Sequence, residues 1–119
     1  MTDLAIIIED DVDLAAIFTE ALQMANFKVE TIRDGLSAQR RLQQIVPCLV
    51  ILDMHIPYLS GADILKLIRA DERLINTAVV ITTADARMGE AYTDIADFVL
   101  IKPIAFTQLR DLTARLHRI

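Results

Sequence analysis

The stretch Leu49-Val50-Ile51-Leu52-Asp53 places four consecutive aliphatic side chains directly before a carboxylate. An aliphatic run of this length is typical of a strand in a parallel sheet that helices cover on both faces. A buried strand rarely ends in an ionised side chain, because Asp is almost never fully buried unless it is paired. Asp53 is therefore the first candidate for a functional residue.

Four more aliphatic runs lie before and after this one. The five runs are Leu4–Ile8, Phe27–Ile32, Leu49–Leu52, Ala78–Ile81 and Phe98–Ile101. After each run, apolar residues recur three and four positions apart, which is the period of an amphipathic helix. These segments contain Leu14–Ala25, Ala38–Ile45, Gly61–Ile68, Ala86–Asp94 and Ala105–Leu116, and the fourth is short and weakly patterned. Five strands that alternate with five helices predict an α/β fold with a parallel sheet and right-handed crossovers.

Local signals mark where three of these helices begin. Asp11 is a good N-cap for the first helix, because its side chain can accept hydrogen bonds from the free N–H groups of the first turn. The turn pair Asp34-Gly35 opens the second helix. Ser60, followed three residues later by Asp63, indicates a capping box at the start of the third.

The bulk composition suits one small cytoplasmic domain. The 119 residues match the usual size of a single domain and contain no linker, so residues 1–119 are expected to form one domain. No run approaches the roughly 18 apolar residues of a membrane span, and no secretory pattern opens the chain. The single Cys48 cannot form an internal disulfide, in agreement with a reducing compartment. The net charge of −5, without a Lys or Arg cluster, argues against direct binding to nucleic acid.

Acidic side chains follow two of the predicted strands. Glu9 and Asp10 come directly after the first run, and Asp53 ends the third. Ligands of open α/β sheets bind beyond the carboxyl ends of the strands, and the three carboxylates converge there if these strands are neighbours. Two unit charges about 4 Å apart repel by about 1 kcal/mol in water and about 4 kcal/mol at an effective dielectric of 20. Mg²⁺, a hard cation that takes oxygen ligands, would compensate for this repulsion.

A basic and a hydroxyl side chain are expected at the same edge of the sheet. Lys102 follows the fifth run and carries a point positive charge suited to a phosphoryl oxygen. Thr83, after the fourth run, adds a hydroxyl donor. With the cation, these groups suit a phosphoryl group with Asp53 as its nucleophile, since carboxylates form covalent phosphoryl intermediates. In-line transfer then depends chiefly on positioning and on charge neutralisation.

These residues lie in stretches through which the chain resembles the receiver domain of response regulators in two-component signalling. The resemblance covers essentially the whole chain, and the four stretches occur in the right order at the ends of predicted strands. They are Ile6-Ile7-Ile8-Glu9-Asp10-Asp11, Leu52-Asp53-Met54-His55-Ile56-Pro57 with Gly61, Ile81-Thr82-Thr83-Ala84 and Ile101-Lys102-Pro103-Ile104. The family implies a flavodoxin-like, doubly wound sheet of five strands in the order 2-1-3-4-5, with five helices.

The resemblance also implies a role for individual residues. Asp53 matches the phospho-acceptor, which takes its phosphoryl group from a phosphohistidine of a sensor histidine kinase or a histidine phosphotransfer protein. Glu9 and Asp10 match the acidic pair that holds Mg²⁺ together with Asp53. The backbone carbonyl of His55 matches a further metal ligand.

Thr83 and Lys102 match the residues through which a receiver responds to its phosphoryl group. Thr83 matches the switch hydroxyl, and Lys102 matches the phosphate contact, whose bond to Pro103 is expected to be cis. Phosphorylation then switches a surface that meets a downstream effector protein or domain. The family implies a switch that catalyses part of its own phosphorylation and dephosphorylation, not an enzyme that turns over an external substrate.

Two features depart from the family pattern. The family commonly has an aromatic residue three positions before the Lys, and this chain has Val99 there, with Phe98 on the opposite face of the strand. The interval from Thr83 to Lys102 holds 18 residues, about three fewer than the family pattern and most of one helical turn. The loss is expected to fall on the fourth helix and to alter the surface around it.

Three alternatives compete with a phosphorylated receiver. A flavodoxin-like cofactor-binding protein needs a Gly-, Ser- or Thr-rich phosphate loop after the first strand, where this chain has Glu9, Asp10 and Asp11. An aspartyl-phosphate hydrolase resembling this chemistry has its nucleophile after the first strand, with a second Asp two residues further on. A degenerate receiver would bind partners without phosphorylation, and the presence of all the expected site residues argues against it.

Overall fold

The computed structural model describes residues 3–117, within which strands and α-helices alternate as the sequence predicts. The strands are β1 (Leu4–Ile8), β2 (Lys28–Ile32), β3 (Leu49–Asp53), β4 (Ala78–Thr83) and β5 (Phe98–Ile101). The helices are α1 (Val12–Met24), α2 (Gly35–Leu42), α3 (Gly61–Ala70), α4 (Ala86–Ala91) and α5 (Phe106–His117), with a 3₁₀ turn at Glu72–Leu74. All strand pairs are parallel, in the order β2-β1-β3-β4-β5. The predicted flavodoxin-like fold class is confirmed.

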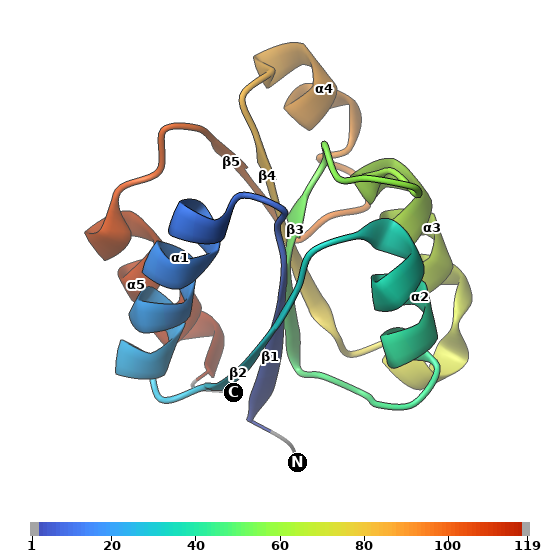
Figure 1. Ribbon diagram of the computed structural model, residues 1–119, viewed down its shortest axis with the longest axis horizontal. Coiled ribbons are helices and arrows are strands. Elements are labelled where there is room, and N and C mark those ends of the chain that lie inside the picture. The colour runs from blue at the N-terminus through green and yellow to red at the C-terminus, as the bar shows by residue number, and fades with distance from the viewer. Residues whose placement is uncertain (1–2, 118–119) are drawn as a thin grey trace.

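Helices cover both faces of the sheet, and the hydrophobic core consequently has two parts. Figure 1 shows α1 and α5 on one face of the sheet and α2 and α3 on the other. Ile51 and Val80 pack in the core under α1 and α5, whereas Leu52 and Ile81 pack in the core under α2 and α3. Burial of each such side chain contributes about 1.5–3 kcal/mol. The alternation continues to the strand ends, so it also decides the face from which each polar end residue projects.

The predicted caps position the segments that follow the strands. Asp11 caps α1, Asp34 caps α2, and Ser60 forms the capping box of α3 with Asp63. The capped starts of α1 and α3 follow β1 and β3 in the chain. Each of the two acidic strand ends therefore leads into the start of a helix. No helix in residues 3–117 is long and apolar enough to cross a membrane.

The fourth helix is six residues long, the shortest of the five α-helices in residues 3–117. Figure 1 shows α4 beyond the ends of β4 and β5. Gly89 permits its close approach to the sheet, because a Cβ atom at this position would lie 2.7 Å from Val99 Cγ1 and 3.3 Å from Thr83 Cγ2. The helix therefore packs directly over Thr83 and Val99.

The segment between α4 and β5 is held by Arg69, in the last turn of α3. Its guanidinium donates hydrogen bonds to the carbonyl oxygens of Ile95 at 2.7 Å and Thr77 at 3.1 Å. It also pairs with Asp97 at 2.8 Å, and the same Asp97 oxygen accepts a hydrogen bond from the Val79 N–H at 2.7 Å. These bonds connect the segment between α4 and β5 to the start of β4.

Candidate functional site

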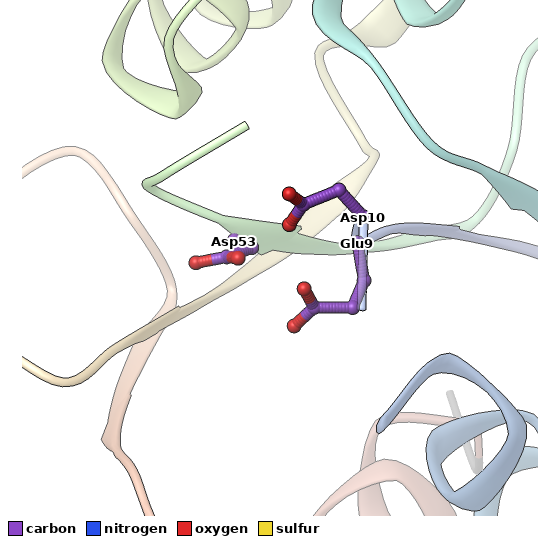
Figure 2. Close-up of side chains that lie close together, drawn as sticks. All are labelled: Glu9, Asp10 and Asp53. Carbon is purple, nitrogen blue, oxygen red and sulfur yellow. The ribbon is translucent and has the colours of Figure 1, made fainter. Parts of the chain in front are cut away.

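Three carboxylates meet at the carboxyl end of the sheet. Glu9 and Asp10 directly follow β1, and Asp53 is the last residue of β3. Each contributes one oxygen to a group in which all the oxygens lie within 4.8 Å of one another, as Figure 2 illustrates. Glu9 is 1% exposed and Asp53 is 4% exposed, whereas Asp10 is open to solvent. The predicted convergence of the three side chains is confirmed.

The backbone around β1 and β3 explains why the carboxylates lie level with one another. Ile8 pairs with Leu52, so the two strands end side by side. At the end of β3, Gly61 brings the start of α3 against the backbone, because a Cβ atom on Gly61 would lie 2.5 Å from the Asp53 carbonyl oxygen. The His55 N–H donates a hydrogen bond to Asp53 Oδ1 at 3.2 Å. These contacts fix the position of the Asp53 side chain.

Lys102 provides a positive charge at the cluster. Its Nζ lies 3.0 Å from Glu9 Oε1 and 3.4 Å from Asp53 Oδ2, and its side chain is 20% exposed. The bond to Pro103 is cis, as expected. Burial alone would lower the pKa of Lys102, but the hydrogen bond to Glu9 and the charge of Asp53 outweigh burial and raise this pKa. The ammonium is therefore firmly charged, yet one cation faces three carboxylates.

Glu9, at 1% exposed, is the most deeply buried of the three carboxylates. Burial raises the pKa of its carboxyl, and the neighbouring Asp53 contributes to the rise. Hydrogen bonds from the Lys102 ammonium and, at 3.2 Å, from the Asp11 N–H act in the opposite direction but do not cancel it. Ionisation of Glu9 therefore costs the folded protein stability.

Replacement of Glu9 with glutamine is expected to stabilise the protein in the presence of a chelator at pH 7. A raised pKa in the folded state means that stability is lost as pH rises from the unfolded-state pKa through the folded-state pKa. Glutamine cannot ionise, so the gain in free energy of unfolding should be smallest below about pH 4, where Glu9 itself is protonated, and should grow toward neutrality. Thermal unfolding at a series of pH values measures this gain in stability. A Glu9→Gln variant that is less stable than wild type at pH 7 contradicts the prediction.

The donor set fits a hard divalent cation. The three grouped ligand atoms are all carboxylate oxygens, which is the chemistry that Mg²⁺ takes in proteins, with water completing its coordination. Two of the three side chains are buried, and the single charge of Lys102 does not balance the three carboxylates. A bound cation would therefore reduce the repulsion among the carboxylates. The contribution of the His55 carbonyl to a metal site stays a prediction.

Thr83 lies at the same edge of the sheet, but its hydroxyl is turned to another partner. The side chain is fully buried, and Oγ1 accepts a hydrogen bond from the Asp85 N–H at 3.0 Å. Within residues 3–117 this hydroxyl makes no hydrogen bond to Asp53 or Lys102. The backbone carbonyl of Thr83 instead accepts the Lys102 N–H at 2.7 Å, which ties the two strand ends together.

Residues 5–114 match the response regulator receiver domain family. The chain belongs to this family. As a receiver domain, it is a phospho-acceptor of two-component signalling.

Two curated relatives are similar to this chain in sequence, and one solved structure is similar to it in fold. The probable methanogenesis regulatory protein FilR2 of Methanothrix harundinacea is 29% identical, over 88% of this chain and 75% of its own length. The DNA-binding response regulator MtrA of Mycobacterium tuberculosis is 31% identical, over 95% of this chain and 50% of its own. The receiver domain of the sensor histidine kinase PA1611 from Pseudomonas aeruginosa, solved with magnesium in its active-site cleft, has a TM-score of 0.85 at 21% identity, with 98% of each chain covered.

The chain spans about half the length of MtrA, which is named as a DNA-binding regulator. The expectation that this chain makes no direct contact with nucleic acid is therefore not confirmed and stays a prediction.

Proposed function

We propose that Asp53 is the phospho-acceptor of this receiver domain and that Glu9, Asp10 and Asp53 hold Mg²⁺, with the His55 carbonyl as a further ligand. The observation that carries the proposal is the convergence of three carboxylate oxygens within 4.8 Å, two of them on buried side chains, beside the Lys102 ammonium. The magnesium ion in the cleft of the PA1611 receiver domain supports the choice of cation.

Each residue then has a defined task in phosphoryl transfer. Asp53 is held by the His55 N–H so that its other oxygen, Oδ2, is available to attack phosphorus. Lys102, whose Nζ already lies 3.4 Å from Oδ2, binds a phosphoryl oxygen. The Thr83 hydroxyl reaches the phosphoryl group if it gives up its hydrogen bond with the Asp85 N–H. Mg²⁺ held by Glu9, Asp10 and Asp53 would neutralise charge on the phosphoryl oxygens. The transfer breaks the P–N bond of a phosphohistidine and forms an acyl phosphate on Asp53.

The proposal extends to partners and setting. The donor is a phosphohistidine of a sensor histidine kinase or a histidine phosphotransfer protein, and the product switches a surface for a downstream effector. Residues 1–119 act as one receiver domain in the cytoplasm, as a self-modifying switch that turns over no external substrate. Because α4 packs directly over Thr83 and Val99, we propose that movement of Thr83 is passed to α4 without an aromatic side chain.

Incubation with a small phosphodonor, followed by intact-mass measurement, tests the proposed function. The wild-type protein is expected to gain one phosphoryl group with Mg²⁺ present and to gain none with a chelator. Reduction of the acyl phosphate with borohydride, followed by peptide mapping, should locate the modification at Asp53. A degenerate receiver gives no adduct under either condition, and an adduct at another residue rejects Asp53 as the acceptor.

A further inference from the structure

Thr82, near the end of β4, carries a fully buried hydroxyl. The residue is 0% exposed, and no group in residues 3–117 forms a hydrogen bond with its Oγ1. Other buried threonines differ: Thr77 donates to the Pro47 carbonyl at 2.7 Å, and Thr83 accepts from Asp85. A buried hydroxyl without a partner costs about 1–3 kcal/mol. Valine would fill the same space in a strand without this cost.

The sheet register places this hydroxyl beside the proposed acceptor. Thr82 is paired with Asp53 on β3 and with Leu100 on β5. Registered neighbours in a parallel sheet project from the same face. Val80, two residues before Thr82, and Ile51, two residues before Asp53, both pack in the core under α1 and α5. The Thr82 and Asp53 side chains therefore leave the sheet on the same side.

Lys102 reaches across this position. It lies two residues after Leu100, and β4, which carries Thr82, lies between β3 and β5. To come within 3.4 Å of Asp53 Oδ2, the Lys102 side chain must pass over the end of β4. Its present partners, Glu9 and Asp53, are also two of the proposed metal ligands. If a cation and a phosphoryl group occupy these carboxylates, the Lys102 ammonium loses its present acceptors. Some of its N–H groups would then need new hydrogen-bond partners.

We propose that Thr82 is a positioning residue of the phosphoryl site, whose hydroxyl accepts a hydrogen bond from Lys102 when Glu9 and Asp53 are engaged by the cation and the phosphoryl group. The inference rests on the proposed function of Asp53. The hydroxyl then holds the ammonium over the end of β4, directed at the phosphoryl oxygens. Thr83 projects from the opposite face of the strand, so the two adjacent threonines have separate tasks.

Thr82→Val removes the hydroxyl and keeps the shape of the side chain, so it tests the inference. With a chelator present, the variant is expected to melt at a higher temperature than wild type, because the unpaired hydroxyl is gone. With Mg²⁺ and beryllofluoride, an analogue of the phosphoryl group, its additional thermal stabilisation should be smaller than that of wild type. Phosphoryl uptake from a small phosphodonor should slow about fivefold, the effect of one lost hydrogen bond. Thr82→Ser should restore the wild-type uptake rate and response to beryllofluoride.

Thr77→Val is the matched control, because it removes another buried threonine hydroxyl, from the residue that directly precedes β4. It breaks the hydrogen bond to Pro47, so it should lower the melting temperature and leave the response to beryllofluoride unchanged. If Thr82→Val does not fold, Thr82→Ser and Thr82→Ala, which differ only by the hydroxyl, give the same comparison.

Two outcomes separate failure of this inference from failure of the proposed function. A wild-type protein that responds neither to beryllofluoride nor to the phosphodonor rejects the proposed function, and this inference with it. A wild-type protein that responds, with Thr82→Val responding equally in stability and in rate, rejects the inference alone.

Discussion

Replacement of Asp53 with asparagine is expected to abolish phosphoryl uptake at every Mg²⁺ concentration. The amide keeps the size of the side chain and can still accept the His55 N–H, but it has no carboxylate oxygen with which to attack phosphorus. The variant should remain folded, because loss of the Asp53 charge reduces the repulsion that helps to raise the pKa of Glu9. Intact-mass measurement after incubation with a small phosphodonor, together with thermal unfolding, checks both expectations.

Asp10→Asn is the matched control for this experiment, since it makes the same chemical change at an exposed member of the same carboxylate group. Loss of one metal ligand should weaken Mg²⁺ binding, and a higher Mg²⁺ concentration should then restore phosphoryl uptake. Excess Mg²⁺ cannot rescue Asp53→Asn, because that variant lacks the nucleophile. A phosphoryl adduct on folded Asp53→Asn would falsify the assignment of Asp53.

Most of the fold could be predicted because aliphatic runs and helix caps are local features of the chain. The strand ends were the weaker part: β3 runs on to Asp53 and β4 to Thr83, past the ends of their apolar runs. The ladder continues there through backbone hydrogen bonds, such as Met54 N–H to the Thr82 carbonyl at 3.1 Å, which no side-chain pattern reveals. Strand existence follows from composition, and strand length depends on pairing.

The candidate site shows the same division. The gathering of Glu9, Asp10 and Asp53 could be predicted, because the carboxyl ends of neighbouring parallel strands share one edge. Two further features could not. Lys102 contacts Glu9 more closely than Asp53, and Thr82 lies beside Asp53 without a hydrogen-bond partner in residues 3–117. Both depend on the register between strands far apart in the sequence. The sequence pointed to Thr83, and only the register shows that Thr82 projects from the same face of the sheet as Asp53.

Replacement of Lys102 with methionine is expected to change Mg²⁺ binding and phosphoryl uptake in opposite directions. Uptake should fall about 100-fold, because a preorganised charge directed at the phosphoryl group is lost. Mg²⁺ should bind about tenfold more tightly, because the ammonium, 3.0 Å from Glu9 and 3.4 Å from Asp53, no longer competes for their oxygens. Titration with Mg²⁺ and intact-mass kinetics measure the two effects. Lys66→Met, on the exposed surface of α3, is the control and should alter neither.

The same variant should lose stability without metal and regain it with metal. Removal of Lys102 leaves Glu9, which is 1% exposed, without its cationic partner, and the pKa of Glu9 should rise further. The expected cost is about 1–3 kcal/mol, less than for a fully buried pair because the Lys102 side chain is 20% exposed. Saturating Mg²⁺ should therefore raise the melting temperature of Lys102→Met more than that of wild type. An equal rise in both proteins, or weaker Mg²⁺ binding by the variant, would show that Lys102 and the cation do not share these carboxylates.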